Sequence, residues 1–125
     1  MKFDFKLFTL FATKAFYNVS STYHLEEILE VFRQYFECYE HYRGKAHPNI
    51  RIEQIEKIIE TMPFANGDMT GDIDFDPDDY EYMIKQHFKT RYNNGRCDYN
   101  INHFFSGDIR GVRYYERFRD DEDND

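Results

Sequence analysis

The 125-residue sequence is 41% hydrophobic and 19% aromatic, which is typical of one folded domain with a real core and argues against a disordered chain. Its formal net charge of −8 at pH 7 argues against simple binding to the phosphates of nucleic acid, which needs clustered Lys and Arg. The same charge fits docking on a basic partner surface, because complementary charge accelerates encounter.

The cysteines and the apolar runs predict a cytoplasmic protein. Cys38 and Cys97 lie far apart and have no zinc-ligand spacing, so we expect buried, reduced thiols and no metal. The apolar run near the N-terminus is too short for a signal peptide, and Asp4 and Lys6 precede it. No segment approaches the roughly 20 apolar residues that span a bilayer, so we expect no membrane association.

The N-terminal segment changes its hydrophobic period within a few residues. It begins with the alternation of a strand and continues with helical spacing. The helix-like positions are Phe8, Phe11, Ala12, Ala15 and Phe16. We therefore expect a short strand or hairpin, or else an irregular lead-in, followed by a helix.

Two amphipathic helices are predicted next, one ending before Gly44 and one before Pro63. The apolar face of the first comprises Leu25, Ile28, Leu29, Phe32, Tyr35, Phe36, Tyr39 and Tyr42. That of the second comprises Ile52, Ile55, Ile58, Ile59 and Met62. On the first helix the opposite face carries Glu26, Glu27, Glu30, Arg33, Glu37 and Glu40. We interpret this charged face as solvated.

A further helix is predicted from Pro77 to about Tyr92. Its expected inner face is Tyr80, Met83, Ile84, Tyr92 and either His87 or Phe88. The last segment starts at Asp98, a candidate N-cap, and keeps helical spacing to Phe118. Because each interior glycine destabilises a helix by about 1 kcal/mol relative to alanine, we expect a short helix, a break near residues 106–108 and a second helix.

These patterns predict a mainly α fold, a single bundle of about four or five helices at residues 1–119 with an acidic tail at residues 120–125. One core is expected to combine the apolar faces of the helices. Its predicted members are Ile28, Leu29, Phe32, Phe36, Ile55, Ile59, Ile84 and Phe88.

The densest group of carboxylates before the tail is the acidic hinge, residues 66–81. Asp76 is a candidate N-cap before Pro77 at the first helical position, where carboxylates face the positive end of the helix dipole. The stretch also resembles an EF-hand calcium loop with Gly71 at position 6, but Pro77 replaces the bidentate glutamate at position 12. A capped acidic turn is the preferred interpretation, and a calcium-stabilised module is an alternative.

The hinge carries alternating carboxylates that would lie on one face of an extended chain, with a repeat of about 6.6 Å. This repeat is close to the spacing of phosphates along a nucleic-acid strand. Such a row could contact a basic groove as a phosphate backbone does. The predicted partner-binding row is Asp72, Asp74, Asp76, Asp78, Asp79 and Glu81.

The opposite charge gathers near the C-terminus, where Arg110, Arg113 and Arg117 follow helical spacing with Tyr114 beside them. This patch could pair with and stack on nucleic acid, or form a solvated face that balances the acidic tail. No histidine pair has metal-ligand spacing, and no nucleophile or phosphate-binding motif is present. We expect no enzymatic activity and no cofactor.

Two stretches, from Cys97 to Arg110 and from Phe75 to Tyr80, resemble small proteins carried on Gram-positive phages, plasmids and conjugative elements. Such mobile elements encode anti-CRISPR and anti-restriction proteins, to which this chain is similar in size, acidity and lack of a catalytic signature. The resemblance implies an inhibitor that docks on a basic nucleic-acid-handling protein, for instance a CRISPR effector nuclease, with DNA mimicry as one mode. The alternative is a nucleic-acid-binding accessory factor in replication or regulation of the element.

Overall fold

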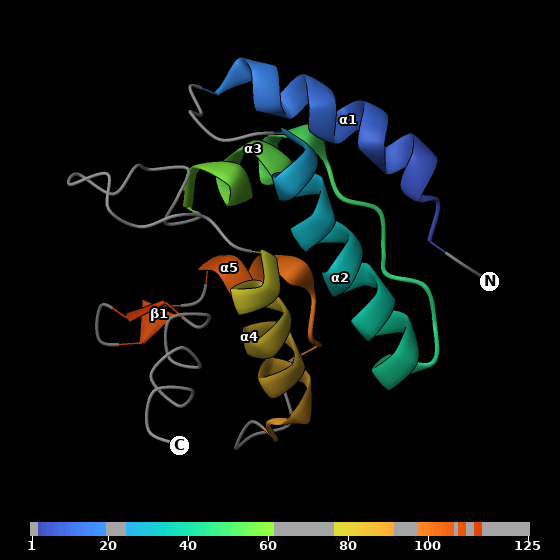
Figure 1. Cartoon of the computed structure of the whole chain (residues 1–125), viewed down its shortest axis with the longest axis vertical. Helices are drawn as coiled ribbons and strands as arrows, with labels where there is room; N and C mark the ends of the chain where they lie inside the picture. The colour runs from blue at the N-terminus through green and yellow to red at the C-terminus, as the bar shows by residue number, and fades with distance from the viewer. Residues whose placement is uncertain are drawn as a thin grey trace.

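The computed structural model describes residues 3–19, 25–61, 77–91, 98–106, 108–109 and 112–113. Over these residues the chain is mainly α-helical, which confirms the predicted fold class (Figure 1). The helices are α1 (Phe5–Asn18), α2 (Leu25–Arg43), α3 (Ile52–Thr61), α4 (Pro77–Lys89) and α5 (Ile101–Ser106). Two short strands follow, β1 (Asp108–Ile109) and β2 (Val112–Arg113).

Helix α2 lies at the centre of the arrangement (Figure 1). It packs against α4 on one side and against α1 on another, while α3 packs against α1 and α5. Gly44 ends α2 with a φ of +70°, a left-handed conformation that glycine adopts without a Cβ clash, and its N–H donates to the Glu40 carbonyl at 3.0 Å. The predicted end of this central helix before Gly44 is therefore confirmed.

The core is built around the apolar side of α2 and is rich in aromatic rings. Seven of the eight predicted core residues are buried, and the eighth, Leu29, packs against them from a partly buried position. Both His87 and Phe88 are buried, so the inner face of α4 includes the two residues that its spacing left as alternatives. Tyr42, expected on the inner face of α2, is 42% exposed because it lies in the last turn.

The N-terminal segment contains no strand among residues 3–19, so the expectation of a strand or hairpin is wrong and that of an irregular lead-in is confirmed. Asp4 accounts for the difference, because its side chain accepts a hydrogen bond from the Leu7 N–H at 3.1 Å and caps α1. The inner face of α1 consists of Phe8, Ala12 and Ala15, whereas Phe11 is 40% exposed.

The C-terminal segment contains the short helix but not the second helix at residues 108–109 and 112–113. There the chain forms an antiparallel pair in which Asp108 is opposite Arg113 and Ile109 is opposite Val112. Ile109 and Val112 are three residues apart, which fits one face of a helix. The same separation fits a cross-strand pair joined by a two-residue turn, so the spacing alone does not distinguish the two structures. Gly111 disfavours the helical alternative.

The start of α5 depends on tertiary contacts. Asp98 is not the N-cap, because its carboxylate accepts from Asn100 N–H at 2.9 Å while Asn100 caps the helix through a 2.9 Å bond from Asn102 N–H. Tyr99 has a φ of 59°, a left-handed conformation that is unfavourable for a bulky side chain. The Tyr99 hydroxyl donates to Thr90 O at 2.6 Å and its carbonyl accepts from the Tyr35 hydroxyl at 2.6 Å, and these bonds hold the turn in place.

Candidate functional site: an acidic groove between two helices

A groove with a volume of about 440 Å³ runs between α2 and α4. Its charged lining consists of four carboxylates and two cations, and each helix contributes two carboxylates and one cation. These residues are Glu30, Arg33 and Glu37 on α2, and Asp78, Glu81 and Lys85 on α4. Gln34, Cys38, His41 and Tyr42 complete the wall on α2. We call this surface the α2/α4 groove.

The charges along the groove are fixed by short ion pairs. Arg33 binds Glu30 through two parallel hydrogen bonds and donates to Glu37 at 2.6 Å. Lys85 pairs with Glu81 at 2.8 Å. The bonds from Arg33 lower the pKa of the Glu30 carboxyl below its ordinary value, and the bond from Glu30 raises the pKa of Arg33. Glu30 and Arg33 therefore both stay ionised at neutral pH.

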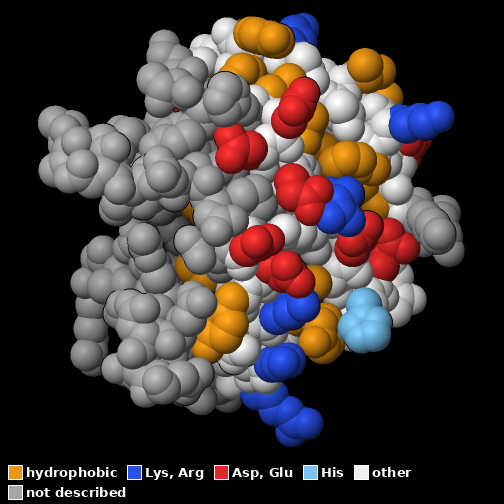
Figure 2. Space-filling model, in the orientation of Figure 1, with side chains coloured by type: hydrophobic (Ala, Val, Ile, Leu, Met, Phe, Trp, Pro, Cys, Tyr) orange, Lys and Arg blue, Asp and Glu red, His pale blue; other side chains and the backbone are white. Residues whose placement is uncertain are grey.

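Carboxylates exceed cations in this lining by four to two, which leaves a formal charge of −2. The side chains of the paired residues are 37–65% exposed, so solvent screens the pairs and they contribute little to folding stability. Figure 2 shows acidic and basic side chains interleaved across this face of the molecule. The lining of the groove therefore carries a net negative charge.

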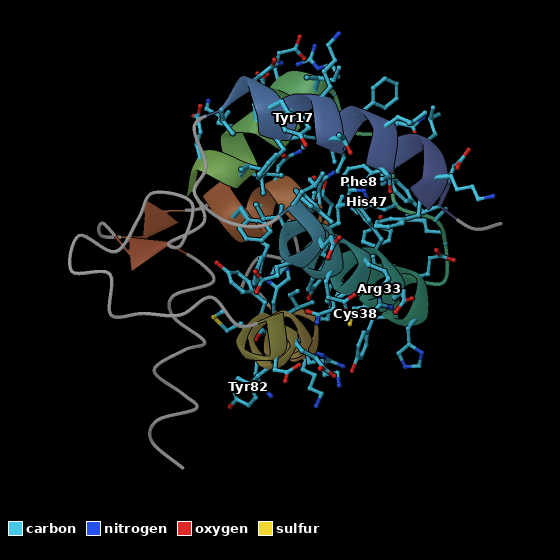
Figure 3. All side chains as sticks on the ribbon, turned by 45° about the horizontal axis from the view of Figure 1, so that its top comes forward. Phe8, Tyr17, Arg33, Cys38, His47 and Tyr82 are labelled. Atoms are coloured by element: carbon cyan, nitrogen blue, oxygen red, sulfur yellow. The ribbon has the colours of Figure 1, made fainter. Side chains whose placement is uncertain are left out.

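Cys38 lies in the same groove and is partly buried (Figure 3). Burial raises the pKa of its thiol, so the protonated, weakly nucleophilic form predominates at neutral pH. Cys38 is a free thiol that is only partly buried, so the expectation of a buried thiol is not met there, and Cys97 lies outside the described residues. Cys38 is therefore not an activated nucleophile.

The structure describes only part of the predicted acidic row. Asp78 and Glu81 lie in α4 and line the groove, and Asp79 belongs to the same helix without a described side chain. Asp72, Asp74 and Asp76 lie outside the described residues. Because α4 begins at Pro77, the extended geometry expected for the row does not continue to Asp78.

The contribution of α2 to this surface was not predicted from the sequence. Glu30 and Glu37 were assigned to a solvated face, and they do remain partly exposed, yet they lie across the groove from Asp78 and Glu81. Their separation of seven residues places them on the same side of a helix, and this spacing was the signal in the sequence that they belong to one surface. The pairing of α2 with α4 could not be read from that spacing.

The basic patch predicted near the C-terminus does not lie on a helix at Arg113, the one member that the structure describes. Arg113 lies in β2 opposite Asp108, whereas Arg110, Tyr114 and Arg117 lie outside the described residues. The helical spacing proposed for the three arginines therefore fails at Arg113.

A second exposed surface is apolar and lies on α1. Its members are Leu7 (46% exposed), Leu10 (68%), Phe11 (40%) and Tyr17 (75%). Their spacing places them along the outer side of the helix, opposite the buried residues that face the core. The molecule thus presents apolar area on α1 and charge along α2 and α4.

His47 has a structural role in the connector between α2 and α3, where it is almost fully buried. Its Nε2 accepts a hydrogen bond from the Ile101 N–H at 3.0 Å, and its Nδ1 lies 2.7 Å from the Pro48 carbonyl. This arrangement requires a neutral ring that donates from Nδ1. Burial lowers the pKa of His47 and so favours that neutral form.

No group of three or more His, Cys, Asp or Glu side chains among the described residues could hold a metal ion. The EF-hand-like part of the acidic hinge lies mostly outside this part of the chain. Within the described helices, none combines the length and apolar character needed to cross a membrane. No protein-family model, curated protein or solved structure matches the sequence.

Proposed function

We propose that this protein is a non-enzymatic inhibitor that docks its α2/α4 groove on a basic surface of a nucleic-acid-handling protein. The observation that supports the proposal is the groove itself, in which four carboxylates from two packed helices surround two cations. A partner that binds nucleic acid presents Lys and Arg in its own groove, and negative charge competes for that surface. An anti-CRISPR or anti-restriction protein is the class proposed, and a CRISPR effector nuclease is the first partner to test.

The rigidity of the groove supports this role. The carboxylates project from two helices that pack against each other and contribute to one buried core, so little backbone conformational entropy is lost when they meet a partner. The ion pairs of Arg33 with Glu30 and Glu37 also fix the side chains in place before binding. Preorganised charge of this kind increases the association rate and the discrimination between partners.

The decisive test changes charge without changing shape. The double variant Asp78→Asn, Glu81→Gln removes two negative charges from the groove. The matched control Glu53→Gln, Glu60→Gln removes two charges from exposed positions on α3. Both are compared with the parent for binding to a purified CRISPR effector nuclease, with and without guide RNA, and for inhibition of its DNA cleavage.

The groove variant should associate about 3–10 times more slowly at low salt, and its rate should depend less on salt, while the control keeps the parental rate. Parental binding that is indifferent to salt, or a groove variant that binds as fast as the parent, would contradict the proposed docking surface. Tight binding of the parent to duplex DNA alone would instead support the accessory-factor alternative.

A further inference from the structure

A second hollow, with a volume of about 400 Å³, lies between the N-terminal lead-in and α2. Three phenylalanine rings and three charged side chains line it. These are Phe3, Phe5, Phe36, Arg33, Glu37 and Glu40. We call it the Phe/Glu pocket.

The aromatic wall of the pocket is held in place by ring contacts. Phe3 stacks on Phe36 with ring centroids 4.0 Å apart, and Phe5 meets the same ring edge-on at 6.4 Å. Phe8 supports this wall from the core, with centroids 5.6 Å from Phe3 and 5.8 Å from Phe5. Phe3 and Phe5 are only partly buried, so their rings bound the pocket and remain accessible.

The polar rim of the pocket is also anchored. The Glu40 carboxylate accepts a hydrogen bond from the Phe3 N–H at 3.2 Å, which ties the lead-in to α2. Glu37 lies one turn before Glu40 on the same helix and is bound by Arg33. Aromatic rings and carboxylates therefore face one space from two segments of the chain.

The charge of this rim selects a cation. Arg33 contributes one positive charge but already donates to both Glu30 and Glu37, so an incoming anion would compete with two bound carboxylates. The lining itself holds two carboxylates, Glu37 and Glu40, and one guanidinium, which leaves a formal charge of −1. The faces of the phenylalanine rings add a negative electrostatic potential that attracts a cation.

We infer that the Phe/Glu pocket receives an arginine side chain of the basic partner, an inference that rests on the proposed function. A guanidinium is planar and weakly hydrated, so it can stack on Phe3 or Phe5 while it pairs with Glu40 or Glu37. A lysine ammonium lacks the planar face and holds its water more strongly. The volume of the pocket lies within the range of ligand sites.

The test uses blocked arginine, Nα-acetyl-arginine methylamide, titrated into the full chain and followed by NMR signals of labelled Phe and Glu. The neutral isostere, Nα-acetyl-citrulline methylamide, and the blocked lysine are the matched probes. Saturable shifts should concentrate on Phe3, Phe5 and Phe36 with arginine. They should be at least about threefold weaker with lysine and absent with citrulline.

Two variants locate the binding energy. Glu40→Gln keeps an acceptor for the Phe3 N–H but removes the charge, and should weaken arginine binding about threefold or more. Phe5→Leu keeps apolar volume and removes a ring, with a similar expected loss. Glu26→Gln, at an exposed position on the same helix, is the control and should bind as the parent does. If Phe5→Leu fails to fold, Glu40→Gln decides the question.

Equal shifts with arginine and citrulline, or an unchanged affinity in Glu40→Gln, would overturn the inference. Arginine-induced shifts confined to the α2/α4 groove would also overturn it, while the proposed function would stand. Conversely, arginine binding in the pocket combined with a groove variant that associates with the nuclease at the parental rate would support the pocket and contradict the docking surface.

Discussion

Two sides of α2 differ in their chemistry, since one is buried and aromatic and another is exposed and charged. On one side Phe32 contacts Phe8 of α1 in a ring-rich core, and on another side Arg33 and Glu37 line the groove with α4. Burial of rings supplies stability in the first region, whereas exposed charge in the second contributes little to stability but can steer a partner. Substitutions on different sides of the same helix should therefore separate folding stability from binding.

The largest effect is expected in the aromatic region. Phe36→Ala should lower the free energy of unfolding by about 3–5 kcal/mol, because the ring contacts Phe3 and Phe8 with centroids 4.0 and 4.8 Å away and leaves a cavity when it is removed. Leu10→Ala removes an apolar side chain that is 68% exposed and should change the free energy of unfolding by less than about 1 kcal/mol. Urea unfolding of both variants measures the difference, and equal losses would contradict the larger stabilising role of the buried ring.

Acid should lower the folding stability of the core, which contains the buried side chains of His87 and His47. Burial, with a smaller effect of His103, lowers the pKa of His87 to about 3, while burial also lowers the pKa of His47. Below pH 6.5 the unfolded chain therefore binds protons that the folded chain does not, so stability falls as pH decreases toward 3. Each buried histidine should contribute a slope of up to about 1.4 kcal/mol per pH unit.

The pH dependence can be assigned with two variants. His87→Phe should reduce the slope of unfolding free energy between pH 6 and pH 4 by about 1.4 kcal/mol per pH unit, since one titrating group is removed. His41→Gln, at an exposed position in α2, should leave the slope unchanged. Urea unfolding at several pH values measures both, and an unaltered slope in His87→Phe would show that His87 is protonated in the folded state.

A hydrogen bond from the Ile101 N–H to His47 links the connector to α5. His47→Phe keeps an aromatic ring but leaves the Ile101 N–H without its acceptor, so the unfolding free energy should fall by about 1–3 kcal/mol. Hydrogen exchange of the Ile101 amide should accelerate more than that of buried amides in α2. Unchanged exchange at Ile101 would mean that another acceptor replaces His47.

The smallest effect on stability is expected in the groove, where a change of charge should alter binding instead. Lys85→Met removes a cation that pairs with Glu81, so the net negative charge of the α2/α4 groove increases. Association with a basic nuclease should become about two- to threefold faster at low salt, with an unchanged melting temperature. Lys57→Met on α3 is the control, and an equal acceleration there would assign the effect to net charge alone.

The sequence by itself determined the local elements. The helical periodicity of residues 25–42, the stop at Gly44 and the start at Pro77 are consequences of side chains close together in the chain, and the structure confirms them. It also determined most of the core, because apolar residues at helical spacing must be removed from water on one side.

Tertiary structure decided how these elements meet. The groove exists because α2 packs on α4 and brings Glu30 and Glu37 opposite Asp78 and Glu81, a pairing that depends on contacts between residues more than forty positions apart. The same reason applies to His47, which caps a helix 54 residues away, and to the Phe/Glu pocket, where Phe3 is tied to Glu40. Spacing along a helix fixes which side a residue faces, and only packing fixes what lies across from it.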